Sequence, residues 1–468
     1  MTLPPGPSGP SGPSGAGASA ARTAPWLIPP TYDASAASLT THVRAIGEVM
    51  TGTGRLWLGP FPAPAALPSD FEDTALVVPT SGSTGTAKAV ALSRAALRAS
   101  QEATAALFAA DGTATGTRGH GFWLPLLPPT HIAGVQVIAR AHRTAEVLGL
   151  DSPALPDPLP DLRGHFDADA FVALAEPALA QAEQRGLPAF TSLVPTQLTR
   201  ILTGATGADA RARSVLKRFA GVLVGGAATG PEVLAAARAQ RIAVRTTYGS
   251  SETAGGCVYD RFPLPGVRLH AQSPDAEGAG RLVVSSPTLA LGYLTADGGI
   301  DTSPFSQTSQ TSQTSETVQG SDAIMRSFTT SDLAQIAEDG ALTVLGRADD
   351  VINTGGRKVL PQDVERAIDR SLMLRDLVLS SLVVGVEDPE WGQRVEALVT
   401  LAEGSDPEEA TALVRSALRT SDVPAHMIPK RVHAVEQLPR LGIGKLDRAA
   451  ARRLAETRLA EGQRPTGD

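Results

Sequence analysis

A run of glycines and hydroxyl residues that ends in a lysine is the part of this sequence best suited to bind phosphate. Residues 80–88 read TSGSTGTAK and directly follow an apolar run at residues 75–79. Glycines let backbone N–H groups close around an oxyanion, hydroxyls add donors, and Lys88 adds positive charge. A Walker A loop requires G-x-x-x-x-G-K-[ST], but Ala87 and Ala89 stand where the second glycine and the metal-binding hydroxyl belong. The run therefore indicates a phosphate loop of another kind, with a flexible surface linker as the alternative.

A second candidate is the string TYGSSET at residues 247–253, which places a carboxylate, Glu252, after a predicted strand. Magnesium that accompanies ATP is held by hard oxygen ligands, and a carboxylate supplies them. The ordinary alternative is a helix N-terminus with a glutamate in its first turn.

Three further strings lie at, or downstream of, the predicted strand at residues 219–224. Residues 224–230 (VGGAATG) form a weak dinucleotide fingerprint in which alanine replaces the second glycine. Residues 328–332 (FTTSD) carry one aspartate. Residues 438–448 (LPRLGIGKLDR) place a glycine directly before Lys445, where a long cation can bridge a carboxylate and a phosphate.

Taken in order with the string GRADD at residues 346–350, these motifs resemble those of the adenylate-forming superfamily, which includes acyl-CoA synthetases, luciferases and peptide-synthetase adenylation domains. Two departures show: Ala87 replaces the proline usual before the loop lysine, and Ser331 replaces a glycine. The resemblance covers most of the chain, from Thr80 to Arg448. It implies an enzyme that forms an acyl-adenylate from ATP and an acid and passes the acyl group to CoA, with ATP, Mg²⁺ and CoA as cofactor or co-substrates.

The same resemblance implies a role for each matched residue. Lys445, Glu252 and His131 would be catalytic. Glu252 would also bind the metal together with Thr80, Tyr248 would stack on adenine, and Asp332 and Arg347 would bind ribose or phosphate. Asp349 would be a hinge, and Arg357 and Lys358 would face CoA. The remaining nucleotide-binding candidates are Ser81, Gly82, Ser83, Thr84, Gly85, Lys88, Gly225, Gly226, Ala227, Thr247, Gly249 and Ser250.

Residues 126–137 (LLPPTHIAGVQV) and 191–202, together with the short N-terminal part, are most similar to o-succinylbenzoate–CoA ligases of menaquinone biosynthesis, of a short actinobacterial-like type. By that resemblance His131 lies against the acyl group; the alternative is a core histidine. The substrate's second carboxylate needs polar donors, and the candidates are Thr196, Gln197, Arg200, Thr247 and Ser251. Another small aryl or alkyl acid, an adenylation module that loads a carrier protein, and an inactive scaffold remain the alternatives.

Alternating strand and helix patterns must position these residues, and they predict an α/β fold with a large N-terminal domain of mainly parallel sheets. Strands are expected at residues 75–80, 189–194, 219–224, 242–247, 342–345, 383–386 and 396–400, and helices at 93–110, 195–202 and 232–240. The pattern changes near Gly346, so we expect a domain of residues 26–346 and a small, mobile α+β domain of residues 347–460. Residues 1–25, an insertion at about 301–321 and residues 461–468 are Pro/Gly/Ser- or Ser/Thr/Gln-rich and are expected not to fold.

Composition excludes several other classes. Of 468 residues, 41 are Lys or Arg and 48 are Asp or Glu, a net charge of −7 that argues against a nucleic-acid partner. The one cysteine excludes an internal disulfide and a cysteine-built zinc site, and fits a reducing cytoplasm. No apolar run approaches the ~20 residues of a membrane span. The expected partners are the small acid, ATP and CoA, and a homo-oligomer stays open.

Overall fold

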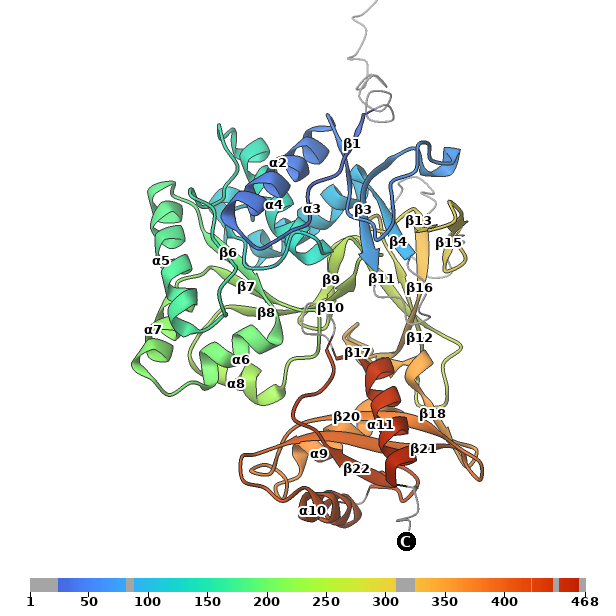
Figure 1. Ribbon diagram of the computed structural model, residues 1–468. Helices are drawn as coiled ribbons and strands as arrows, with labels where there is room; N and C mark the ends of the chain where they lie inside the picture. Colours follow the sequence, from blue (N-terminus) through green and yellow to red (C-terminus); the bar gives the residue numbers. More distant parts are fainter. Residues whose placement is uncertain (1–23, 81–87, 309–324, 422, 441–445, 463–468) are drawn as a thin grey trace, which may run out of the picture. The chain divides into compact units, whose positions relative to one another are not determined.

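The computed structural model describes residues 24–80, 88–308, 325–421, 423–440 and 446–462 (Figure 1). By their internal contacts, the residues divide into two compact units. Unit 1 comprises residues up to 260 with residues 264–267 and 286–326, and unit 2 comprises residues 261–263, 268–285 and the chain from 327 onward.

The first sheet of unit 1 has the strand order β1-β2-β3-β4-β13-β14. The strands β1, β2 and β3 are parallel, while β4, β13 and β14 each run antiparallel to their neighbour. Residues 74–78 of β3 are fully buried, as expected for a strand covered on both faces. The bounds are β1 (Trp26–Leu27), β2 (Arg55–Trp57), β3 (Thr74–Thr80), β4 (Lys88–Ser93), β13 (Gly292–Thr295) and β14 (Ile300–Asp301).

The second sheet of unit 1 places β9, β8, β7, β6 and β5 side by side, with β5 to β8 parallel and β9 antiparallel. Their bounds are β5 (Phe122–Leu124), β6 (Ala189–Leu193), β7 (Gly221–Val224), β8 (Val244–Ser250) and β9 (Gly255–Tyr259). In parallel strands the carboxyl ends share one edge, so the loops after β6, β7 and β8 meet there.

Helices cover the second sheet on both faces. A hydrophobic core joins β5, β6 and β7 to α5, α6, α7 and α8, and α5 and α7 lie side by side in Figure 1. On the other face, Phe108 of α3 and Trp123 of β5 both stack on Phe190 of β6. The helices of unit 1 are α2 (Ala36–Thr51), α3 (Arg94–Ala110), α4 (Ile132–Leu148), α5 (Ala168–Gln184), α6 (Pro195–Thr203), α7 (Gly207–Leu216) and α8 (Pro231–Ala239), with 3-10 turns η1 (Ser69–Phe71) and η2 (Thr115–Thr117).

Unit 2 begins with antiparallel strands and continues into a second sheet after residue 350. The strands of its first sheet are β11 (Arg268–Gln272), β12 (Gly280–Ser285), β16 (Met325–Ile336, whose first two residues belong to unit 1) and β17 (Leu342–Arg347), and the two-residue strand β10 (Phe262–Pro263) precedes them in the chain. The 3-10 turn η3 (Ala348–Asp350) leads to β18 (Ile352–Thr354), β19 (Arg357–Val359), β20 (Val378–Asp388), β21 (Gly392–Leu401) and β22 (Arg431–Ala434). The helices α9 (Pro361–Arg370) and α10 (Pro407–Thr420) pack on one face of this sheet, and α11 (Arg448–Gly462) packs on the other.

The predicted α/β class is confirmed, and so are the strands and helices predicted around residues 75–110 and 189–247. Parallel pairing occurs in the two sheets of unit 1, and antiparallel strands extend them. Ser93 caps α3, since its side chain accepts a hydrogen bond from the Ala96 N–H at 3.1 Å. The predicted domain boundary falls inside unit 2, at η3. The two hydrophobic cores of the chain after η3 contain only residues that follow this boundary. The two compact units are not divided there, however, so the domain boundary at residue 347 stays a prediction.

Three segments that were expected not to fold are structured in part. The segment at residues 301–308 is structured, because Asp301 belongs to β14 and β15 (Phe305–Thr308) follows; the rest of the expected insertion to residue 321 lies outside the described residues. Residues 24 and 25 are also anchored: the Arg55 side chain and N–H donate to the carbonyls of Ala24 and Pro25. Likewise, α11 includes residues 461 and 462 of the expected tail. Among the helices of the described ranges, none is long and apolar enough to cross a membrane.

Candidate active site

The predicted phosphate loop connects two neighbouring strands of unit 1. Thr80 ends β3, Lys88 begins β4, and the two residues are direct partners in the antiparallel ladder. The candidates between them, at positions 81–85, lie outside the described residues. Because Thr80 and Lys88 oppose each other, the hairpin brings the predicted metal-binding hydroxyl and the phosphate-binding lysine to the same end of the two strands.

Glu252 lies in the tight turn between β8 and β9, where it is 8% exposed. The Thr253 hydroxyl closes this turn: it accepts from the Ser250 N–H at 2.9 Å and donates to the Gly255 carbonyl at 2.7 Å. A Cβ at Gly249 would lie 2.1 Å from the Gly255 carbonyl oxygen, so only glycine fits there. The alternative of a helix N-terminus at this motif is therefore wrong, and Tyr248, Gly249 and Ser250 belong to the end of β8 itself.

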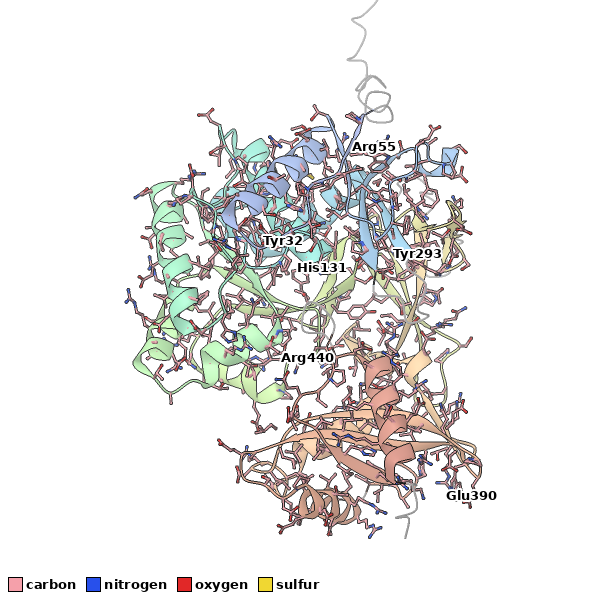
Figure 2. The ribbon with its side chains drawn as sticks, viewed as in Figure 1. Tyr32, Arg55, His131, Tyr293, Glu390 and Arg440 are labelled. Atoms are coloured by element: carbon pink, nitrogen blue, oxygen red, sulfur yellow. The ribbon has the colours of Figure 1, made fainter. Side chains whose placement is uncertain are left out.

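The Glu252 carboxylate is held by a tyrosine from another sheet. The Tyr293 hydroxyl of β13 donates to Glu252 Oε1 at 2.9 Å. The Lys88 ammonium lies 5.2 Å from the centroid of the Tyr293 ring and 2.8 Å from Asp301 Oδ2. The predicted metal ligand and the predicted phosphate-binding lysine are thus joined through Tyr293, which Figure 2 labels.

The glycine turn after β7 lies beside the end of β8. The Thr247 hydroxyl donates to the Val224 carbonyl at 3.4 Å, and a Cβ at Gly225 would lie 2.2 Å from that hydroxyl. Gly226 has a φ of 86°, which favours glycine, and both it and Ala227 are exposed. These residues form an accessible rim at the carboxyl edge of the sheet, where a ligand is expected in an open α/β sheet.

His131 is the residue before the first turn of α4, and its side chain makes no capping hydrogen bond. It is partly buried, and burial lowers the pKa of its imidazole, so the ring is neutral near pH 7. Among the candidates for the second carboxylate, Gln197 uses its side-chain oxygen to accept from the Val194 N–H at 2.9 Å, and Arg200 donates to the Phe166 carbonyl at 3.1 Å. Thr196 is exposed and Ser251 is half-buried.

In unit 2, Asp332 of β16 and Arg347 of β17 are direct partners across an antiparallel ladder. The Thr330 hydroxyl accepts from the Asp332 N–H at 3.0 Å, and the Arg347 guanidinium lies 3.3 Å from Asp349 Oδ2. The two predicted ribose ligands and the predicted hinge residue are therefore neighbours.

The segment that carries Lys445 lies outside the described residues, but both its ends are fixed. Arg440, labelled in Figure 2, and Leu446 form an antiparallel bridge, and the Asp447 N–H donates to the Pro439 carbonyl at 2.9 Å. These contacts bring together the residues on either side of the segment that contains the predicted catalytic residue.

Arg448, three residues after Lys445 in the chain, binds three acceptors. It contacts Glu365 of α9 at 2.6 Å, the Val383 carbonyl at 2.6 Å and Asp350 of η3 at 3.3 Å. Burial raises the pKa of Asp350, while the positive charge of Arg448 opposes that rise. Arg448 thus links η3, which carries the predicted hinge residue Asp349, to the start of α11.

Comparison with known proteins identifies the family. The profile of the AMP-binding enzyme C-terminal domain matches residues 367–445. A Mycobacterium tuberculosis protein named probable 2-succinylbenzoate–CoA ligase is 37% identical over 388 residues, which are 81% of this chain and 84% of the relative. A 2-succinylbenzoate–CoA ligase of Geobacillus kaustophilus is 28% identical and covers 90% of this chain and 79% of its own length. The chain belongs to the 2-succinylbenzoate–CoA ligase family of adenylate-forming enzymes.

Solved structures agree on the fold of this ligase family. The o-succinylbenzoate CoA synthetase of Bacillus subtilis, solved with its acyl-adenylate intermediate, superposes with a TM-score of 0.60 at 18% identity, covering 92% of this chain and 87% of that one. ATP-bound MatB from Rhodopseudomonas palustris also gives 0.60, at 23% identity over 84% of this chain and 70% of that one. At these identities the likeness concerns the fold alone.

The family member described here brings together more residues than its motifs indicate. Tyr293 and Asp301 contact Glu252 and Lys88, yet neither stands in a predicted motif, and Asp301 lies in a segment that was expected not to fold. Arg448 was the end of a motif with no assigned role. Tyrosine and aspartate residues in short hairpins are common, so the sequence around Tyr293 and Asp301 carries no signal that would have marked either residue as part of a site. Among the described residues no cluster of three or more His, Cys, Asp or Glu could hold a metal alone.

Proposed function

We propose that this chain is an ATP-dependent ligase that activates 2-succinylbenzoate as an acyl-adenylate and transfers the acyl group to CoA, in the cytoplasm, for menaquinone biosynthesis. The observation that carries the proposal is the 37% identity over 81% of the chain to the mycobacterial relative of that name. The linkage of Glu252, Tyr293 and Lys88 in unit 1 supports the ATP-dependent part. The single cysteine, which is buried, supports a reducing compartment.

In the first half-reaction, the acid carboxylate attacks the α-phosphate of ATP and pyrophosphate leaves. Catalysis of phosphoryl-type transfer depends mostly on positioning and charge neutralisation. Lys88 and the hydroxyls of residues 80–84 hold the β- and γ-phosphates. Lys445 neutralises the charge that develops between the carboxylate and the α-phosphate.

The Mg²⁺ that such ligases require fits the residues present. The carboxylate of Glu252 and the hydroxyl of Thr80 are hard oxygen donors, and Mg²⁺ is usually bound by one or two carboxylates together with substrate phosphates. When bound, the ion neutralises phosphate charge. Tyr293 fixes the Glu252 carboxylate through Oε1 at 2.9 Å and so orients it toward that role.

In the second half-reaction, the CoA thiol attacks the acyl carbonyl, loses its proton and displaces AMP. The segment after Asp349 turns about that residue between the two steps, which withdraws Lys445. Asp332 and Arg347 hold the ribose throughout. His131, neutral near pH 7, contacts the acyl group without adding charge.

The test measures pyrophosphate release and CoA thioester for 2-succinylbenzoate and a panel of aryl and alkyl acids, each with and without CoA. We expect pyrophosphate release with 2-succinylbenzoate, and thioester only when CoA is present. Benzoate, which lacks the succinyl carboxylate, should give little of either. Thioester from another acid but none from 2-succinylbenzoate would overturn the substrate assignment, and adenylate that passes only to a carrier-protein thiol would overturn CoA as acceptor.

A further inference from the structure

Two side chains of the β13–β14 hairpin contact the two best-described residues of the nucleotide site. Tyr293 and Asp301 are direct partners across this hairpin. The Tyr293 hydroxyl binds Glu252, and Asp301 Oδ2 accepts from the Lys88 ammonium at 2.8 Å. All four residues belong to unit 1. One short hairpin therefore contacts both the proposed metal ligand and the proposed phosphate-binding cation.

The strand register explains why Asp301 reaches Lys88. Strand β13 pairs with β4 so that Thr295 opposes Lys88, and Tyr293 opposes Val90 two residues further on. The lysine side chain therefore lies over the tyrosine ring, toward Asp301. The Asp301 carboxylate is also fixed from its own side, since it accepts from the N–H and the hydroxyl of Ser303 at 3.0 and 2.7 Å.

Asp301 is charged whenever the enzyme works. Its hydrogen bonds from Lys88 and Ser303 hold its pKa to about 2. A carboxylate that lies 2.8 Å from the Lys88 ammonium offsets part of the attraction this lysine has for other anions. A polyphosphate that approaches Lys88 must displace Asp301 or bind beside its negative charge.

We propose that Asp301 is a resident counter-ion of Lys88 that competes with the polyphosphate of ATP and of pyrophosphate, and so limits how tightly this enzyme holds both. The inference rests on the phosphate-binding role of Lys88 in the proposed function. Asp301 acts through Lys88 and is a positioning residue. It binds the Lys88 ammonium before the nucleotide binds, and it binds the ammonium again after pyrophosphate leaves.

The exchange is feasible because the pair is only partly shielded from water. The side chains of Lys88 and Asp301 are 29% and 27% exposed. Ion pairs at such positions are weak and salt-sensitive, so a polyphosphate with several negative charges can replace one carboxylate. Removing the competitor should tighten binding by about three- to fivefold.

The experiment compares wild type, Asp301→Asn and a matched control, Asp297→Asn. Asp297 lies in the turn of the same hairpin and bonds to Thr295 and Gly299, so its replacement removes the same charge nearby without touching Lys88. Dissociation constants are measured calorimetrically for α,β-methylene-ATP and for inorganic pyrophosphate, with and without Mg²⁺, at low and high salt.

We expect Asp301→Asn to bind both ligands about three- to fivefold more tightly than wild type, with a smaller gain at high salt. Asp297→Asn should stay within about twofold, a bound set by the weak, screened effect of an exposed charge. Asp301→Glu restores the charge and should return the constants toward wild type. Equal or weaker binding by Asp301→Asn, including weakening seen only with Mg²⁺, overturns the inference and makes Asp301 a contributor to nucleotide binding. A wild-type protein that binds neither ligand overturns the proposed function as well, whereas wild-type binding without tightening in the variant overturns this inference alone.

Discussion

Lys88 of unit 1 and Arg448 of unit 2 both lie beside predicted functional residues, but their surroundings differ. Among the residues that the structure describes, Lys88 has one carboxylate partner, Asp301, and it lies over the face of Tyr293. Arg448 is 18% exposed on its side chain and contacts two carboxylates and a backbone carbonyl, with Glu365 bound through two guanidinium nitrogens. The lysine is a compact charge with one replaceable partner, and the arginine uses its fixed fork of donors on several acceptors at once.

This difference separates a cation that can exchange its anion from one that holds the fold together. A ligand phosphate can replace Asp301 because only one contact is lost. Glu365 Oε1 also accepts from the Val383 N–H, but displacing Arg448 from its partners would take the guanidinium donor away from Glu365 Oε2 and from the Val383 carbonyl. Losing donors to partly buried acceptors costs more than an exposed ion pair contributes. We therefore expect substitutions at lysines to change nucleotide chemistry and substitutions at Arg448 to change stability.

The largest effect should come from Lys445→Ala. A donor aimed at developing charge typically contributes about 10²–10³ in turnover, so adenylation measured by pyrophosphate exchange should fall by about that factor. Thioester formation from supplied acyl-adenylate and CoA serves as the internal control and should keep most of its rate. An equal loss of rate in adenylation and in thioester formation would contradict the assigned role. It would indicate that Lys445, like Arg448, stabilises the fold.

A Tyr293→Phe variant tests whether the phenol orients the proposed metal ligand. It removes the hydroxyl that donates to Glu252 but keeps the ring under Lys88. Loss of a group that orients a metal ligand usually weakens metal binding by about 10–100-fold, and the Mg²⁺ concentration for half-maximal activity should rise by about tenfold. The control is Tyr259→Phe, whose hydroxyl contacts Thr104 and Arg140 instead. A Tyr293→Phe enzyme with an unchanged Mg²⁺ requirement would remove Tyr293 from the metal site.

The two cations can be compared directly with Lys88→Met and Arg448→Met. We expect Lys88→Met to change the free energy of unfolding by at most about 1 kcal/mol while it raises the KM for ATP. Arg448→Met should lower the free energy of unfolding by about 2–4 kcal/mol, because several partners lose their donor. Urea denaturation followed by circular dichroism measures both. Similar destabilisation by the two variants would erase the distinction between an exchangeable and a structural cation.

The parts of this molecule that could be predicted from sequence are those that local pattern determines. The run at residues 75–80 forms β3, because apolar residues bounded by glycines and hydroxyls make a buried strand. Gly225 and Gly249 are required because a Cβ at these positions would lie 2.2 Å from the Thr247 hydroxyl and 2.1 Å from the Gly255 carbonyl oxygen, and both glycines stood in predicted motifs. The ion pair of Lys88 with Asp301 could not be predicted, since its partners are 213 residues apart and meet only through the register of β4, β13 and β14.

The smallest effect concerns Cys257, and it tests whether exchange at Lys88 needs the backbone of unit 1 to open. Cys257 lies on β9, five residues after Glu252, and is fully buried. Burial raises its pKa to about 12. The neutral thiol is therefore favoured in the folded protein, and the stability this gives is complete below about pH 9 and lost as pH rises toward 12. If only side chains move when nucleotide binds, the thiol should not react with a thiol reagent at pH 8, with or without ATP, and one thiol per chain should react after denaturation. If ATP accelerates the reaction of Cys257 with the reagent in the native protein, the β8–β9 hairpin must open when nucleotide binds. In that case nucleotide binding would move the backbone of unit 1 as well as the side-chain contact of Lys88.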